Sequence, residues 1–99
     1  MPPMNPRLMR PTRQRPRVPG APGNVVAIES FQITWHPPLS DGGSPVLEYR
    51  VYINGTLAET IAAPETVSVD SVSAGSVVRV SAVNAVGEGP KSDPVVAVA

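Results

Sequence analysis

Length, composition and charge restrict this chain of 99 residues to a single small domain with a modest core. Cysteine is absent, which excludes disulfides and thiolate metal sites and leaves packing alone to hold the core. No stretch approaches the roughly 20 apolar residues of a membrane span. Prolines also interrupt the N-terminal region, where a signal peptide needs an apolar run. We therefore predict no membrane segment and no export signal.

The net charge of zero hides two oppositely charged parts. Residues 1–22 hold seven of the thirteen prolines, all three methionines, five arginines and no acidic residue. Residues 23–99 hold all eight acidic residues against Arg50, Arg79 and Lys91. Because proline removes an amide donor and favours extended backbone, we predict an arm over 1–22 that is disordered unless a partner orders it. The predicted folded body is 23–99.

From residue 24 onward, short runs of β-branched and aromatic residues alternate with turn signals, which is the pattern of an antiparallel sandwich. In the second run Phe31, Ile33 and Trp35 alternate with polar residues, so one face of that strand is predicted to be core. The third run leads into Asn54-Gly55, which predicts a type I′ hairpin turn.

The later runs repeat this alternation. Val78, Val80 and Ala82 alternate with polar residues, and a loop with two glycines follows over 84–90. The predicted strands are 25–28, 31–35, 49–53, 56–61, 66–69, 78–82 and 95–98. No helix is needed, so we predict an all-β, seven-stranded antiparallel sandwich.

Four segments in order carry a family resemblance. They read PGNV (22–25), ITWHPP (33–38), GGSPV with YRV (42–46 and 49–51), and VRVSAVNAVGEGP (78–90) followed by Ser92. Each segment alone is weak evidence of a family. In this order and spacing, however, the four segments resemble the fibronectin type III family over about three quarters of the chain. The resemblance implies an immunoglobulin-like sandwich, which the predicted extended N-terminal arm precedes. The family's tyrosine near the start of the penultimate strand is replaced by Ser76.

A sandwich of this size needs one large aromatic side chain between its sheets, and Trp35 is the only tryptophan. We predict a core of Trp35, Tyr49, Val51 and Val80. Replacing Trp35 with a small residue should then prevent folding.

Possible catalytic and ligand sites have simpler interpretations as surface or turn residues. His36 lies near Ser40 and Asp41. A hydrolytic site needs a base held by an orienting carboxylate beside a nucleophile in a pocket, and the sequence indicates no such pocket there. We therefore predict a surface loop histidine, no enzymatic activity, no metal site and no cofactor. The segment Asn54-Gly55-Thr56 matches a glycosylation acceptor, and a hairpin turn explains the same residues.

The arm is the predicted partner-binding element. Its candidate residues are Met4, Arg7, Leu8, Met9, Arg10, Arg13, Arg15, Arg17 and Val18. We favour an anchor to an acidic protein surface. Nucleic-acid binding is an alternative, which the missing aromatic residues and the acidic body disfavour. A solubilising tail is the third possibility.

The resemblance implies a non-enzymatic module that binds or spaces, as in adhesion proteins, receptors, secreted carbohydrate-degrading enzymes and phage virion proteins. A single module with a basic arm in place of neighbouring domains favours a small virion protein that decorates a phage capsid or tail. Its expected partners are capsid or tail subunits, with a host-surface protein or glycan on the sandwich. The alternative is a spacer or receptor-binding module of a larger extracellular protein.

Overall fold

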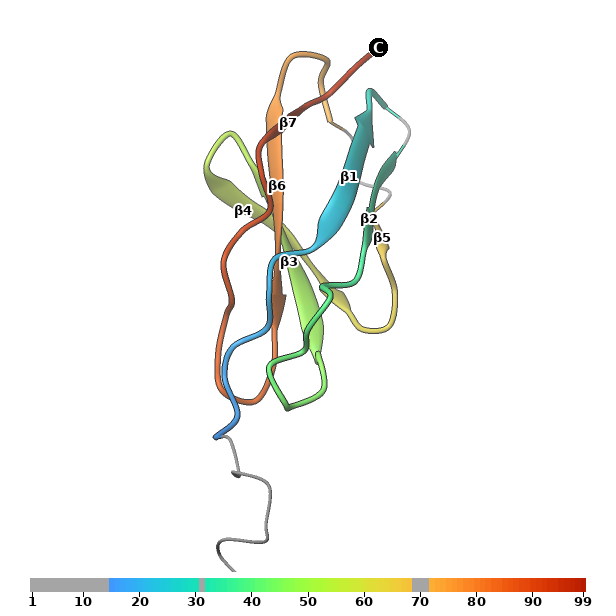
Figure 1. The fold of residues 1–99 in the computed structure, drawn as a ribbon. Helices are drawn as coiled ribbons and strands as arrows, with labels where there is room; N and C mark the ends of the chain where they lie inside the picture. Colours follow the sequence, from blue (N-terminus) through green and yellow to red (C-terminus); the bar gives the residue numbers. More distant parts are fainter. Residues whose placement is uncertain (1–14, 31, 69–71) are drawn as a thin grey trace, which may run out of the picture.

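The computed structural model describes residues 15–30, 32–68 and 72–99. Within these ranges the chain forms two antiparallel sheets that pack face to face (Figure 1). The all-β, immunoglobulin-like sandwich predicted from the sequence is confirmed. No helix in this part of the chain is long and apolar enough to cross a membrane.

One sheet has three strands and the other has four. The three-stranded sheet has the order β1-β2-β5, with β1 at Gly23–Ile28, β2 at Gln32–His36 and β5 at Val67–Ser68. The four-stranded sheet has the order β4-β3-β6-β7, with β4 at Thr56–Ala62, β3 at Glu48–Ile53, β6 at Val77–Val83 and β7 at Val95–Val96. All seven strands lie where the sequence predicted them. The predicted strand residues Phe31 and Val69 lie outside the described ranges.

The C-terminal segment changes sheets, which shortens the strand predicted over 95–98. Val95 and Val96 pair with β6, whereas Val98 forms a parallel bridge to Ile28 of β1. The Val98 amide donates to the Ala27 carbonyl at 3.0 Å, and the Val98 carbonyl accepts from the Glu29 amide at 2.7 Å. The segment therefore closes one side of the sandwich by bonding to both sheets (Figure 1).

The core lies between the sheets and is built around one aromatic pair. Trp35 and Tyr49 are both buried, with ring centroids 5.5 Å apart and planes tilted by 60°. Val51 and Val80, the other two predicted core residues, are completely buried. Val25, Ala27, Ile33, Val72, Val78, Ala82 and Ala97 complete the buried cluster.

The β3–β4 hairpin turns at Asn54 and Gly55, as predicted. Their φ angles are 51° and 82°, and a type I′ turn requires positive φ at both central residues. The Asn54 carboxamide oxygen also accepts a hydrogen bond of 2.9 Å from the Val77 amide, which ties the turn to the start of β6. This structural role explains the asparagine without glycosylation.

Candidate partner-binding surface

Three segments meet at the end of the sandwich opposite the C-terminus (Figure 1). They are the described part of the predicted arm, residues 15–22, and the loops 37–47 and 84–90. We call them together the arm junction. The arm backbone passes close to both loops, because its atoms are the nearest neighbours of Gly42 in one loop and of Gly89 in the other.

Backbone hydrogen bonds hold the arm to the first loop. The Arg17 amide donates to the Gly42 carbonyl at 2.8 Å, and the Gly20 amide donates to the Ser40 carbonyl at 3.0 Å. Pro19, between them, is fully buried. The arm is too rich in proline to form a continuous ladder of backbone hydrogen bonds. It is held instead by single hydrogen bonds from its non-proline residues and by the burial of proline rings.

Asn84 connects all three segments of the arm junction. Its side chain is buried, and its Nδ2 donates to the Arg17 carbonyl at 2.6 Å and to the Asp41 carbonyl at 2.8 Å. Its Oδ1 accepts from the amides of Val86 at 2.9 Å and Gly87 at 3.2 Å. Both ends of the carboxamide are thus satisfied, which is the condition for burying so polar a group. The sequence placed Asn84 in a loop and predicted no role for it.

Two glycines allow the arm to approach the loops this closely. A Cβ atom on Gly89 would lie 2.0 Å from the Pro19 carbonyl oxygen, and one on Gly42 would lie 2.2 Å from the Arg17 carbonyl oxygen. Any side chain at either position would displace the arm backbone. Glycine at positions 42 and 89 is therefore needed for contact between the loops and the arm.

Replacing Gly89 with alanine should release the arm without disturbing the core. We expect a loss of about 1–3 kcal/mol, because the clash breaks a few hydrogen bonds and exposes Pro19. Trypsin should also cleave faster after Arg17, since the backbone there is no longer held. Gly23→Ala is the matched control, because nothing lies within 4 Å of its added Cβ. Equal trypsin cleavage rates in both variants would contradict the described position of the arm.

The structure places three of the nine predicted partner-binding residues. Arg15, Arg17 and Val18 all have exposed side chains, although the Arg17 backbone is bonded on both sides. The others, Met4, Arg7, Leu8, Met9, Arg10 and Arg13, lie outside the described residues, so their role stays a prediction. The division of the chain at residue 22 also stays a prediction.

The arm junction itself carries exposed apolar side chains. Leu39 is fully exposed, and Val86 and Val18 are 51% and 38% exposed. Neither Leu39 nor Val86 was predicted as a site residue. A recognisable signal exists, since each is an isolated apolar residue within a loop rich in turn-forming residues. Arg15 and Arg17 are exposed in the same junction, as is the acidic Asp41.

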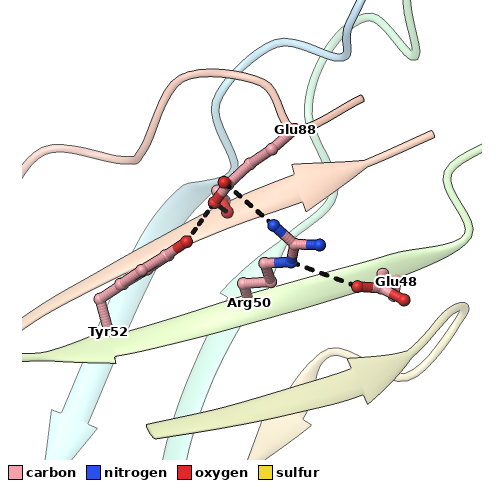
Figure 2. Close-up of polar contacts among 5 residues, drawn as sticks. Glu48, Arg50, Tyr52 and Glu88 are labelled. Carbon is pink, nitrogen blue, oxygen red and sulfur yellow. Dashed lines mark hydrogen bonds and ion pairs between the residues drawn. The ribbon is translucent and has the colours of Figure 1, made fainter. Parts of the chain in front are cut away.

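The outer face of the four-stranded sheet carries an ionic network (Figure 2). Arg50 bonds to Glu48 at 3.3 Å and to Glu88 at 3.1 Å. Glu88 also accepts hydrogen bonds from the hydroxyls of Tyr52 and Ser81. Arg50, Tyr52 and Glu48 all point outward from β3, so strand alternation brings them together.

The surroundings of Glu88 shift its acidity. Partial burial acts to raise the pKa of its carboxyl, but hydrogen bonds from Ser81 and Tyr52 and the charge of Arg50 outweigh it. The pKa is therefore held below the ordinary value of 4.5. The same contact with Glu88 raises the pKa of the Tyr52 phenol. Above Tyr52, the Lys91 ammonium lies 4.0 Å from the ring centroid and adds a cation–π contact.

This network should make the stability of the fold depend on acid pH. Because the pKa of Glu88 is lower in the folded state, its contribution is fully present above pH 4.5 and is lost as the pH falls through the folded value. Glu88→Gln should lower the melting temperature at pH 7 and flatten its decline below pH 4.5. The matched control is Glu65→Gln in an exposed loop position. A Glu88→Gln variant that keeps the full acid dependence would contradict the network's role.

The residues considered for catalysis do not form a reactive site. His36 is exposed as predicted, but it is the last residue of β2 and not part of a loop, and its Nδ1 lies 3.0 Å from Asn24 Nδ2. Ser40 and Asp41 accept hydrogen bonds from the amides of Gly42 and Gly43 and so shape their own loop. Across the described ranges no group of three side chains could hold a metal ion.

Sequence comparison decides the family. The model of the fibronectin type III domain matches residues 20–98. The chain belongs to the fibronectin type III family. The match begins at Gly20, inside the arm junction, so the family domain includes part of the segment that the sequence assigned to the arm.

Solved fibronectin type III structures have a similar fold. The sixth such domain of human fibronectin type III domain containing protein 3 is 26% identical, with a TM-score of 0.59 and 89% of each chain covered. Domains A168–A170 of titin are 25% identical with a TM-score of 0.59, over 80% of this chain and 32% of that one. The twitchin kinase region from C. elegans is 23% identical with a TM-score of 0.64, over 80% of this chain and 16% of that one.

The chain thus spans under a third of the length of the twitchin and titin chains that it matches. Fibronectin type III domains are structural and binding modules found within larger proteins, and in general they are not catalytic. They act through contacts with other proteins. The surfaces of this sandwich are therefore the places to look for its function.

Proposed function

We propose that this chain is a protein-binding module that docks to its partner through the basic N-terminal arm. The observation that supports this is the construction of the arm junction. It bonds the backbone of residues 17–20 to two loops but leaves the side chains of Arg15, Arg17 and Val18 exposed. A fixed backbone with free side chains lowers the entropy that binding costs.

The partner's surface carries carboxylates next to apolar patches. Five arginines give the arm its charge, but an exposed ion pair contributes only about 0–1 kcal/mol. Ion pairs alone would not hold an extended segment, so apolar burial has to add to them. Leu39 and Val86 in the junction supply apolar surface, and Met4, Leu8 and Met9 in the arm add to it.

Our finer proposal is a small phage virion protein that is anchored to capsid or tail subunits by the arm and displays its sandwich outward. Its support is the charge pattern, in which a basic, proline-rich arm precedes an acidic module. The C-terminus lies at the far end of the sandwich from the arm junction, so a docked arm leaves the opposite end free (Figure 1). Mass spectrometry of purified particles from the source culture tests this localisation, and absence of the chain from them would contradict it.

The experiment for the docking role uses the full chain with an affinity tag after Ala99, remote from the arm. Proteins captured from the source extract are compared for the parent, a variant with Arg7, Arg10 and Arg13 changed to glutamine, and the control Arg79→Gln on the sandwich. We expect the triple variant alone to lose its specific partner. Capture that survives in the triple variant would contradict docking through the arm, and capture abolished by nuclease in the parent would favour nucleic-acid binding.

A further inference from the structure

The three-stranded sheet is free of charged residues. Its strands β1, β2 and β5 have 6, 5 and 2 residues, and none of these is Asp, Glu, Lys or Arg. Alternation along the strands turns one set of these side chains away from the core. This outward set, which we call the neutral face, is Asn24, Val26, Ile28, Gln32, Thr34, His36 and Val67.

The neutral face is apolar at its centre. Val26 pairs with Thr34, and Thr34 pairs with Val67, so these three residues form one row across all three strands. Val26 is 47% exposed and Val67 is 38% exposed. The next row adds Ile28 and, through its bridge to β1, Val98. The result is a row of β-branched side chains in contact with solvent.

The four-stranded sheet presents a different outer surface. Its exposed Leu57 pairs with Tyr52, which in turn pairs with Arg79. The ionic network around Arg50 occupies the neighbouring row. Exposed charges of this kind keep a sheet hydrated and oppose stacking against another sheet. The described residues of the neutral face include no Asp, Glu, Lys or Arg.

We propose that the neutral face pairs with the neutral face of a second copy of this chain, around a two-fold axis. A charged partner surface would lose hydration there without gaining a counter-charge, so the contacting surface has to be uncharged as well. A second copy offers such a surface. A two-fold axis at Thr34 would place the row of Val26, Thr34 and Val67 against itself, as an isologous interface requires.

The size of the neutral face makes this pairing weak. Strands of 6, 5 and 2 residues that lie about 4.8 Å apart cover less than about 15 by 20 Å. That falls well short of the roughly 800 Å² per partner in a standard stable interface. We therefore expect a dissociation constant on the order of 0.1–1 mM, so that the contact acts where copies are held close together.

Sedimentation velocity of the full chain tests this proposal over about 0.01–1 mM, at about 50 and 500 mM NaCl. We expect a monomer–dimer equilibrium. Its dissociation constant should differ by less than about twofold between the two salt concentrations, because the proposed interface contains no ion pairs. Association between the basic arm and the acidic body of another copy would instead weaken strongly with salt. A chain that stays monomeric up to about 1 mM would overturn the proposal.

A matched pair of variants locates the contact. Thr34→Lys puts a charge at the centre of the neutral face and should weaken dimerisation at least about tenfold. Thr60→Lys makes the same change on the outer face of β4 and should leave it unchanged. Dilution in NMR gives a readout without mutation, with shifts expected in β1, β2 and β5. Shifts confined to β3, β4 and β6, or equal dimerisation by both folded variants, would refute the neutral-face dimer.

Discussion

Replacing Trp35 with alanine is expected to abolish cooperative folding. Trp35 is buried between the sheets against Tyr49, and truncating a buried tryptophan costs about 3–5 kcal/mol. A domain this small has a total stability of roughly 4–11 kcal/mol at about 0.05–0.15 kcal/mol per residue. The cavity therefore removes a large part, or all, of the margin that keeps the protein folded.

Far-UV circular dichroism during urea unfolding measures this effect without relying on tryptophan fluorescence. Trp35→Phe is the informative control, because the indole Nε1 is buried with no hydrogen-bond partner. Phenylalanine removes that unsatisfied donor while keeping most of the ring volume, so its cost should be only about 1–2 kcal/mol. A Trp35→Ala variant that unfolds near the parent's midpoint would contradict the assigned core.

Replacing Asn84 with alanine is expected to cost about 2–4 kcal/mol, the largest effect of any polar residue in the described part of the chain. The change leaves the carbonyls of Arg17 and Asp41 and the amides of Val86 and Gly87 without their partner. Each of these part-buried hydrogen bonds contributes about 0.5–1.5 kcal/mol, and water that enters the opened site recovers part of their loss.

Hydrogen exchange distinguishes this loss from general destabilisation. In Asn84→Ala, the amides of Arg17 and Gly20 should exchange faster than in the parent, while those of β3 and β6 stay protected under native conditions. Ser92→Ala is a suitable comparison, because its hydroxyl accepts a hydrogen bond from the Val80 amide of β6 within the sandwich. Unchanged protection at Arg17 and Gly20 in Asn84→Ala would refute the connecting role of Asn84.

Most of the fold follows from local patterns that the sequence displays. The alternation around Ile33 and Trp35 predicted a strand with one buried face, and both residues are buried on β2. Asn54-Gly55 predicted a hairpin, because few residues other than asparagine and glycine adopt positive φ easily. Such features depend on neighbouring residues only, so a single sequence contains them.

The features that the sequence patterns did not predict depend on contacts between distant segments. Val98 joins β1 because the end of the chain passes the edge of that sheet, and nothing in the local pattern of 95–98 encodes the change. Asn84 and Gly89 resemble ordinary loop residues until the arm lies beside them. The contacts of Arg17 and Gly20 with the loops were not predicted for the same reason, since proline-rich segments have no ladder pattern to recognise.

The candidate site was predicted only in outline. The excess of arginine in the arm indicated a binding element, and Arg15, Arg17 and Val18 are exposed. The contributions of Leu39 and Val86 become visible only when the loops are placed around the arm. The neutral face was also not predicted from the sequence. Its three strands are separate in the sequence, and their lack of charge defines a surface only because they lie in one sheet.

Site-specific photo-crosslinking tests most directly whether the arm docks the chain to its partner. A photoreactive phenylalanine analogue is placed at Leu8 in the arm or at Thr60 on the sandwich, and both proteins are irradiated in the source extract. We predict one dominant crosslinked protein from position 8, absent when Arg7, Arg10 and Arg13 are also changed to glutamine, and little product from position 60. Crosslinks that form from position 60 and not from position 8 would show that the sandwich, and not the arm, makes the contact.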